Sequence, residues 1–218
     1  MATFYTIHPE TPQTRVIEQL KDGLQNHAVM LYPTDTVYAI GCDLNSKSAL
    51  QRVRQIKQLS NDKPLTFLCS SLSNITQYAI VRDSAYRIMR RLIPGPYTFI
   101  LPMTKQVPKL VMNPKRKTTG IRVPDHPLCQ SLLETLGNPI ISTSAHIVDE
   151  DTLRRSKPYT SRFELFDALE KVVDIIVDDG EEPGYETSTI LDLTTEEPIV
   201  VRRGQGWERV ENFVVEVN

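Results

Sequence analysis

The chain has few of the residues that mark specialised protein classes. Its 218 residues include only 3 cysteines and 1 tryptophan, and the formal net charge at pH 7 is −2. The wide spacing of Cys42, Cys69 and Cys129 indicates reduced, packed thiols rather than a disulfide framework or a zinc site. A net charge this close to zero disfavours a surface built entirely for nucleic acid, because such surfaces carry a basic excess.

Long hydrophobic runs are also absent. No apolar segment approaches the roughly 20 residues that a membrane-spanning helix needs. The first residues show neither the charge pattern nor the cleavage site of a secretory signal, so we expect a cytoplasmic location and no membrane partner. The 40% hydrophobic and 24% charged residues are typical of a globular protein, and the length favours one domain over residues 1–218.

The familiar catalytic and nucleotide-binding motifs are missing. The sequence contains no Walker loop, no Gly-x-Gly-x-x-Gly, no nucleophile elbow and no His-Glu-x-x-His. These absences argue against the P-loop, dinucleotide-binding, α/β-hydrolase and zincin classes. The acidic segment 178–182 is more typical of a solvated turn than of a metal site, so we predict no metal ligands.

Hydrophobic periodicity predicts helices that alternate with strands. Helices are expected after the N-caps Thr11, Ser46, Asp83 and Ser161, and over 127–136 with Gly137 as the C′ residue. Strands are expected over 29–31, 63–69, 97–101, 121–123, 139–143, 172–177, 188–193 and 199–202. The alternation predicts parallel pairing and the last two strands an antiparallel hairpin, so we predict an α/β fold with a mixed sheet. The polar segment 147–160 is expected to be a loop or lid.

Four groups of hydroxyl and basic residues lie near the ends of predicted strands. They are Pro33-Thr34-Asp35-Thr36, Ile141-Ser142-Thr143-Ser144-Ala145-His146, Gly120-Ile121-Arg122-Val123-Pro124, and Ser188-Thr189 with Arg202 and Gly204. Hydroxyls and guanidinium groups donate hydrogen bonds to phosphate and carboxylate, and open α/β sheets bind ligands at strand ends. Together the groups predict a site for a phosphate-bearing small molecule such as a nucleotide. Taken singly, each also fits a structural role: a proline turn, a serine-rich turn, or an ion pair of a buried arginine.

The histidines give a weaker signal. His146 lies beside Ser144 in the sequence, but neighbouring turn residues without a nucleophile elbow do not form a catalytic triad. His8, His27 and His126 are expected in loops or at helix starts, solvated or capping. A general-base role of His146 in the hydrolysis of an adenylate stays open as an alternative.

As a set, these segments resemble the YrdC/YciO/TsaC family, which includes the threonylcarbamoyl-AMP synthases. The segments that carry the resemblance are Tyr32-Pro33-Thr34-Asp35-Thr36-Val37-Tyr38, Gly41-Cys42-Asp43, Ile56-Lys57-Gln58, Lys63-Pro64-Leu65, Pro94-Gly95-Pro96-Tyr97-Thr98, Gly120-Ile121-Arg122-Val123-Pro124, Thr143-Ser144-Ala145, Ser188-Thr189-Ile190-Leu191-Asp192-Leu193 and Arg202-Arg203-Gly204. The resemblance covers nearly the whole chain and looks nearer to the YciO branch than to the synthases. It implies a twisted, open sheet of parallel and antiparallel strands, with flanking helices, around a concave cavity.

The resemblance also implies a reaction and a set of ligands. Threonylcarbamoyl-AMP synthases convert L-threonine, bicarbonate and ATP into threonylcarbamoyl-AMP and pyrophosphate, for the N6-threonylcarbamoyladenosine modification of tRNA, with Mg²⁺ arriving with ATP. By motif, Thr34, Thr36 and Arg122 would bind the threonine part, and Lys57 and Arg122 would be catalytic. The residues implied at the nucleotide are Lys57, Lys63, Ser144, Ser188 and Arg202.

Two positions depart from the synthase pattern. Leu59 and His146 stand where the synthases have arginine and asparagine. Loss of one charged transition-state contact commonly lowers a rate by about 10²- to 10³-fold, so we expect weak or altered activity. An alternative is a protein that binds double-stranded RNA or tRNA with little catalysis. Its candidate contacts are Arg82, Arg87, Arg90, Arg91, Lys105, Lys109, Lys115, Arg116 and Lys117, for which a solvated charged face is the ordinary explanation.

Overall fold

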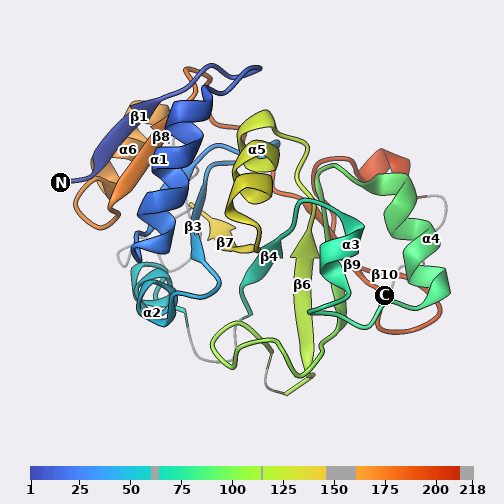
Figure 1. The fold of residues 1–218 in the computed structure, drawn as a ribbon. Coiled ribbons are helices and arrows are strands. Elements are labelled where there is room, and N and C mark those ends of the chain that lie inside the picture. The colour runs from blue at the N-terminus through green and yellow to red at the C-terminus, as the bar shows by residue number, and fades with distance from the viewer. Residues whose placement is uncertain (60–63, 114, 146–160, 212–218) are drawn as a thin grey trace.

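The computed structural model describes residues 1–59, 64–113, 115–145 and 161–211. Over these ranges ten strands form one sheet, accompanied by six α-helices and a short 3-10 helix (Figure 1). The strands are β1 Thr3–Thr6, β2 Met30–Tyr32, β3 Ala39–Asp43, β4 Thr66–Leu68, β5 Tyr97–Pro102, β6 Thr118–Arg122, β7 Ile140–Ser144, β8 Ile175–Asp178, β9 Thr189–Asp192 and β10 Ile199–Arg202. The helices are α1 Thr14–Gln25, α2 Lys47–Ile56, α3 Leu72–Ile75, α4 Asp83–Leu92, α5 Pro127–Leu136, α6 Arg162–Leu169 and the 3-10 helix Trp207–Arg209.

The strand order in the sheet is β1-β8-β2-β3-β7-β4-β6-β5-β9-β10. Four neighbouring pairs are parallel and five are antiparallel. The predicted mixed sheet and its closing hairpin, β9 with β10, are therefore confirmed. More of the strand pairs are antiparallel than the alternation of helices and strands suggested. One reason is β3, which follows β2 without a helix between them and pairs antiparallel with both β2 and β7.

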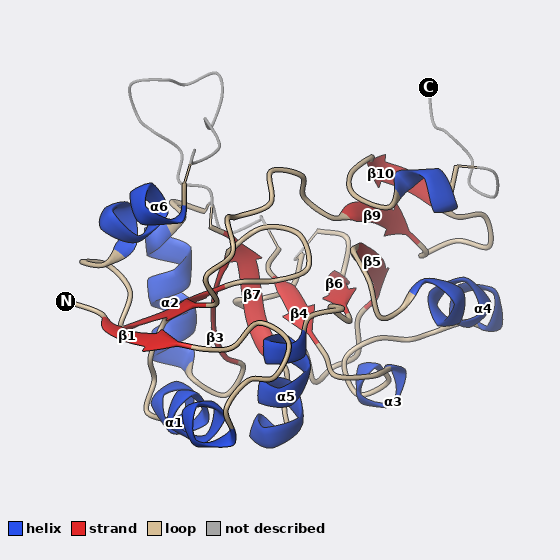
Figure 2. Ribbon diagram, turned by 90° about the horizontal axis from the view of Figure 1, so that it is seen from above, coloured by secondary structure: helices blue, strands red, loops and turns tan. Residues whose placement is uncertain are grey.

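Helices cover both faces of the sheet around β2 and β3, with α1 and α5 on one side and α2 and α6 on the other (Figure 2). Alternate residues of a strand point to opposite faces. Met30 and Tyr32 accordingly belong to the apolar cluster that contains buried residues of α1 and α5. Leu31, between them, belongs to the cluster that contains residues of α2 and α6. The two clusters fix β2, and thereby the position of the loop that follows it.

Two of the predicted helix caps are confirmed and two are wrong. The hydroxyls of Ser46 and Ser161 accept hydrogen bonds from the N–H groups of Ala49 and Glu164, each at 3.2 Å. Thr11 does not cap α1, because its amide and hydroxyl lie 3.2 and 3.1 Å from the Nδ1 of His8 and the helix begins later. Asp83 is the first residue of α4 rather than its cap, which is Arg82.

The helix over residues 127–136 lies where it was predicted. Pro127 occupies its first turn, and Gly137 ends it in the left-handed conformation with φ 73°. A residue without Cβ adopts this conformation at little cost, which is why glycine commonly terminates helices.

Sequence patterns missed two strands and one short helix. β1 is a largely exposed strand of four residues at the edge of the sheet, too short and too exposed to show a clear alternation of apolar and polar residues. β3 is buried along its whole length and contains Gly41, so it shows no alternation. α3 is a helix of 4 residues, too short for a periodic signal. The predicted loop or lid over 147–160 lies outside the described residues.

No helix in the described ranges is long and apolar enough to cross a membrane.

The three cysteines are free and buried, as predicted. Burial raises the pKa of Cys42 and of Cys69 to about 12. Because the thiolate is the reactive form, we expect a thiol reagent such as DTNB to leave the folded protein unlabelled at mildly alkaline pH. All three thiols should react once the chain is unfolded in guanidinium chloride. Fast labelling of a thiol in the folded protein would contradict this packing.

Candidate functional site

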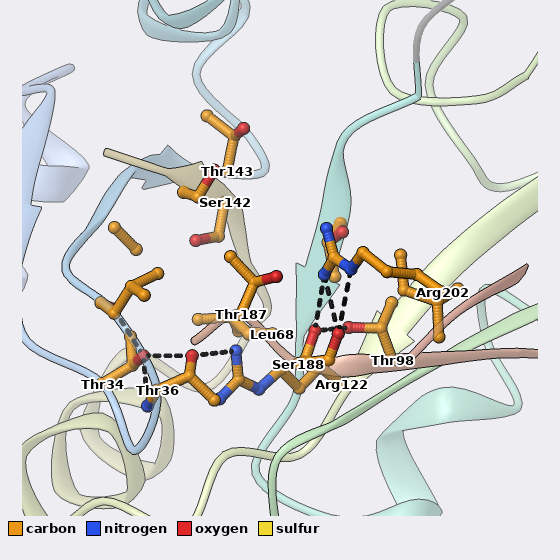
Figure 3. A pocket seen from close by; sticks show the side chains of 15 residues that line it. Thr34, Thr36, Leu68, Thr98, Arg122, Ser142, Thr143, Thr187, Ser188 and Arg202 are labelled. Carbon is orange, nitrogen blue, oxygen red and sulfur yellow. Dashed lines mark hydrogen bonds between the residues drawn. The ribbon is translucent and has the colours of Figure 1, made fainter. Parts of the chain in front are cut away.

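A pocket of about 150 Å³ lies across seven neighbouring strands, from β3 to β10, and the loops beside them (Figure 3). Hydroxyl groups dominate its lining, and Arg122 and Arg202 are its only charged residues among those the structure describes. The full lining is Thr34, Thr36, Val37, Ala39, Thr66, Leu68, Thr98, Arg122, Ser142, Thr143, Ser144, Thr187, Ser188, Ile190 and Arg202. We call it the arginine pocket.

Arg122, the last residue of β6, contacts the loop after β2. Its Nη1 donates to the hydroxyl of Thr36 at 3.0 Å, and its Nη2 donates to Oδ1 of Asp35 at 2.6 Å. The side chains of Arg122 and Asp35 are each only 9% exposed. The ion pair that was one explanation of this buried arginine is therefore present, and the guanidinium also faces the pocket (Figure 3).

The loop itself is held by its own hydroxyls. Thr34 donates to the carbonyl of Val37 at 2.7 Å and accepts from the N–H of Thr36 at 3.2 Å. These bonds form a compact turn that presents both threonine side chains to the same cavity.

Arg202, the last residue of β10, lies across the pocket from Thr34 and Thr36 (Figure 3). Its Nε and Nη2 donate to the carbonyl of Ser188 at 3.1 and 2.8 Å, and Nη2 lies 3.2 Å from the Ser188 hydroxyl. That hydroxyl lies 2.9 Å from the hydroxyl of Thr98. No carboxylate of the described residues lies within ion-pair distance of Arg202. Arg202 is exposed overall, but partial desolvation of its guanidinium and the positive charge of Arg122 lower its pKa, and both effects favour a bound anion.

Two glycines allow the loops around the pocket to approach each other. A Cβ at Gly184 would lie 1.8 Å from the carbonyl oxygen of Thr36, and one at Gly204 would lie 2.2 Å from the carbonyl oxygen of Thr187. Real Cβ atoms are never this close to backbone atoms, so a side chain at either position would push a pocket loop away.

A second pocket, of about 430 Å³, lies on the other side of the loop after β2 and shares Thr34, Thr36 and Val37 with the first. Its lining includes several carboxylates and no lysine or arginine among the described residues. These acidic residues are Glu10, Asp35, Asp125, Asp179, Glu181 and Glu182. We call it the acidic pocket. Together the two pockets fall in the size range of about 300–1,000 Å³ that is typical of small-molecule sites.

The acidic segment 178–182 is not wholly the solvated turn that was predicted. Asp179 is 6% exposed, and its Oδ1 accepts hydrogen bonds from Tyr38 at 3.2 Å and from the N–H of Glu181 at 3.1 Å. Its Oδ2 lies 3.5 Å from Nε2 of His126. Burial opposes ionisation of Asp179, but these donors outweigh burial and lower its pKa. The prediction failed because the turn folds inward against β3 and the start of α5.

No group of three or more histidine, cysteine or carboxylate side chains is arranged to hold a metal ion within the described ranges. His126 precedes α5 and packs against Asp179, so its predicted capping or solvated role is only partly right. His146 lies outside the described residues.

Most of the predicted site residues line the arginine pocket. These are Thr34, Thr36, Arg122, Ser144, Ser188 and Arg202. Lys57 ends α2, is half-buried and does not line this pocket, while Lys63 lies outside the described residues. Their roles in binding and catalysis stay predictions. The basic residues of the RNA hypothesis are exposed, and two of them lie near acids, Arg82 at 3.7 Å from Glu196 and Arg116 at 3.5 Å from Asp192.

Sequence patterns missed several hydroxyl residues of the lining as ligands. Thr66 and Thr98 lie inside strands, where threonine is favoured for its branched side chain whatever its function. Ser142 was part of a recognised hydroxyl run but was not selected. The two-residue spacing of a strand offered one signal for Thr66. Residues two positions apart point to the same face, and Thr66 and Leu68 both line the arginine pocket.

Fold and pocket together define a class: an α/β protein whose mixed sheet brings two guanidinium groups and many hydroxyls into one anion-favouring cavity. Comparison with known sequences identifies the family. Residues 22–204 match the Sua5/YciO/YrdC family, described as "Telomere recombination", and the chain belongs to this family.

Relatives within the family include proteins of two kinds. The uncharacterized protein YciO of Escherichia coli K12 is 42% identical over 206 residues, which is 94% of this chain and 97% of that protein. A threonylcarbamoyl-AMP synthase of Vibrio vulnificus is 33% identical over 134 residues, or 60% of this chain and 72% of that protein.

Solved structures agree with this assignment. The crystal structure of E. coli YciO matches with a TM-score of 0.87 and 41% identity, covering 98% of this chain and all of that one (100%). The crystal structure of P. abyssi Sua5 complexed with L-threonine matches with a TM-score of 0.85 and 25% identity, covering 99% of this chain and 63% of that one.

Proposed function

We propose that the chain binds ATP and L-threonine in the two neighbouring pockets and forms threonylcarbamoyl-AMP from them and bicarbonate. The observation that carries this proposal is the pairing of Arg122 and Arg202 in one cavity, with hydroxyls around them and one carboxylate behind. Two guanidinium groups that line one pocket favour a ligand that brings negative charge. The family includes proteins named as threonylcarbamoyl-AMP synthases, which supports the reaction class.

In the proposed reaction the amino nitrogen of threonine bonds to the carbon of bicarbonate, a C–O bond of bicarbonate breaks, and water leaves, which gives an N-carboxylate. An oxygen of that carboxylate attacks the α-phosphorus of ATP, the bond from that phosphorus to the bridging oxygen breaks, and pyrophosphate leaves. This chemistry needs positioning and charge stabilisation and no covalent nucleophile. Arg122 and the Thr34 and Thr36 hydroxyls would hold the threonine part. Arg202, Ser188 and Ser144 would bind the phosphate groups.

Mg²⁺ enters the proposal as part of the ATP substrate. Magnesium is usually bound by one or two carboxylates and by substrate phosphates, with several waters kept. The described residues present no dedicated cluster for a metal ion, and the donors around the arginine pocket suit the phosphate oxygens rather than the metal.

We expect turnover to be low. Leu59 lines a separate hollow with Arg54, outside the arginine pocket, and contributes no charge to the nucleotide. If an arginine at this position supplies one transition-state contact in the synthases, its absence lowers the rate by about 10²- to 10³-fold.

Calorimetric titration of ATP and of L-threonine, followed by a product assay with ¹³C-bicarbonate, tests the function. Formation of ¹³C-labelled threonylcarbamoyl-AMP, detected by mass spectrometry, is the expected result. Arg15→Ala is the matched control, because Arg15 is exposed on α1 and lines neither pocket. Failure to bind ATP or threonine overturns the proposal. Binding of ATP without any labelled adenylate would favour the alternatives of RNA binding or adenylate hydrolysis.

A further inference from the structure

Asp35 lies outside the arginine pocket but contacts one of its two arginines. It lines the acidic pocket and not the arginine pocket, whereas its partner Arg122 lines the arginine pocket and not the acidic one. The Asp35 carboxylate therefore pairs with the guanidinium without itself lining the arginine pocket. It is the only carboxylate of the described residues that pairs with either arginine of that pocket.

Asp35 has fewer hydrogen bonds than a buried carboxylate that serves stability alone would need. Its Oδ1 is bound by Arg122, but its Oδ2 is buried and has no hydrogen-bond partner, and the Nε of Arg122 is also buried without one. Burying a charged oxygen without a donor costs free energy, and a buried ion pair often gives no net stabilisation over apolar residues. A role of Asp35 in ligand binding would account for this arrangement.

The charges around the arginine pocket supply that explanation. Arg122 and Arg202 carry two positive charges, Asp35 returns one negative charge, and the rest of the described lining is uncharged. We propose that Asp35 is a specificity-determining residue that holds the pocket at one net positive charge. Such a pocket favours a multiply charged group over a singly charged one less strongly than a pocket with two net positive charges would.

This inference rests on the proposed function and refines it. In that reaction the retained groups, a carboxylate and the phosphate of an adenylate, each carry one negative charge. The leaving group, pyrophosphate, carries several. A pocket with one net positive charge holds pyrophosphate less tightly, relative to the adenylate, than a pocket with two would, because the Coulomb energy scales with the product of the charges. The single net charge therefore helps pyrophosphate to leave.

The variant Asp35→Asn tests the charge directly. Asparagine has nearly the same shape and keeps an oxygen that accepts from Arg122. Calorimetric titration with pyrophosphate and with L-threonine gives the two dissociation constants. We expect the preference for pyrophosphate over threonine to rise by about tenfold or more, with threonine affinity changed by less than about threefold.

Two controls separate charge from structure. Asp43 is also a buried carboxylate, bonded to the N–H of Asn45 and to Asn138, and lines neither pocket, so Asp43→Asn should leave the preference unchanged. Asp35→Glu keeps the charge and should also leave it unchanged. Thermal unfolding of each variant checks that it folds.

Several results would overturn the inference. If Asp35→Asn and Asp35→Glu weaken both ligands by the same factor, Asp35 only holds Arg122 in place. If Asp35→Asn does not fold, a preference in Asp35→Glu shifted toward pyrophosphate contradicts the charge argument. Wild-type protein that binds neither ligand overturns the proposed function and the inference with it, whereas binding with an unchanged preference in Asp35→Asn overturns the inference alone.

Discussion

Replacing Arg202 by alanine should lower the rate of threonine-dependent pyrophosphate release by about 10²- to 10³-fold, the usual effect of removing one charged transition-state contact. Arg202 is the guanidinium of the pocket that no described carboxylate neutralises, and its other contacts are with Ser188. Its charge is therefore available to phosphate oxygens as negative charge moves from the α-phosphorus to the leaving group. The measurement is the steady-state rate at saturating ATP and threonine.

Two further variants test whether the loss of rate comes from the charge and position of Arg202. Arg202→Lys keeps the charge but not the planar fork, so it should recover part of the lost rate. Arg15→Ala removes an exposed arginine and should leave the rate unchanged. If Arg202→Ala retains wild-type turnover while folding normally, the arginine pocket is not the site of the reaction.

Replacing Gly184 by alanine should both destabilise the protein and abolish threonine binding. The new Cβ would lie 1.8 Å from the carbonyl oxygen of Thr36, and neither backbone segment can yield without moving the loop that also holds Thr34 and Asp35. Overpacking of this kind costs about 1–3 kcal/mol and occasionally more. For a chain of this length that corresponds to a fall of roughly 2–4 °C in Tm for each kcal/mol.

Gly137→Ala provides the contrast. A Cβ at Gly137 meets nothing within 4 Å, but φ is 73°, so alanine there should cost only about 1 kcal/mol and leave threonine binding intact. Calorimetry and thermal unfolding measure both properties on both variants. Wild-type affinity for threonine in Gly184→Ala would show that the contact between the two loops does not form the site.

Sequence patterns predicted the parts of the fold that depend on local chemistry. Ser46 and Ser161 cap helices because a serine hydroxyl satisfies a free N–H, and Gly137 ends α5 because of its conformational freedom. Patterns failed where tertiary contacts determine the structure. β3 is recognisable as a strand only from its pairing with its two antiparallel neighbours. The hydroxyl of Thr11 contacts His8 instead of capping α1, and periodicity does not encode this contact.

The same distinction applies to the site. Arg122 could be singled out because an arginine inside a short apolar strand needs an anionic partner, and Arg202 because it accompanies the Ser188-Thr189 hydroxyls near strand ends. Their union in one pocket depends on the order of β6, β5, β9 and β10 in the sheet, which sequence reasoning did not derive. The inward turn of Asp179 and the approach of Asp35 from the acidic pocket are also long-range contacts, so both roles became visible only in the folded chain.

Pyrophosphate release by the wild-type protein, measured with ATP, Mg²⁺ and bicarbonate in the presence and absence of L-threonine, tests the central claim most directly. The account predicts release that requires both threonine and bicarbonate and is lost in Arg122→Ala and Arg202→Ala. Release that proceeds equally well without threonine, or that survives in both variants, would contradict it.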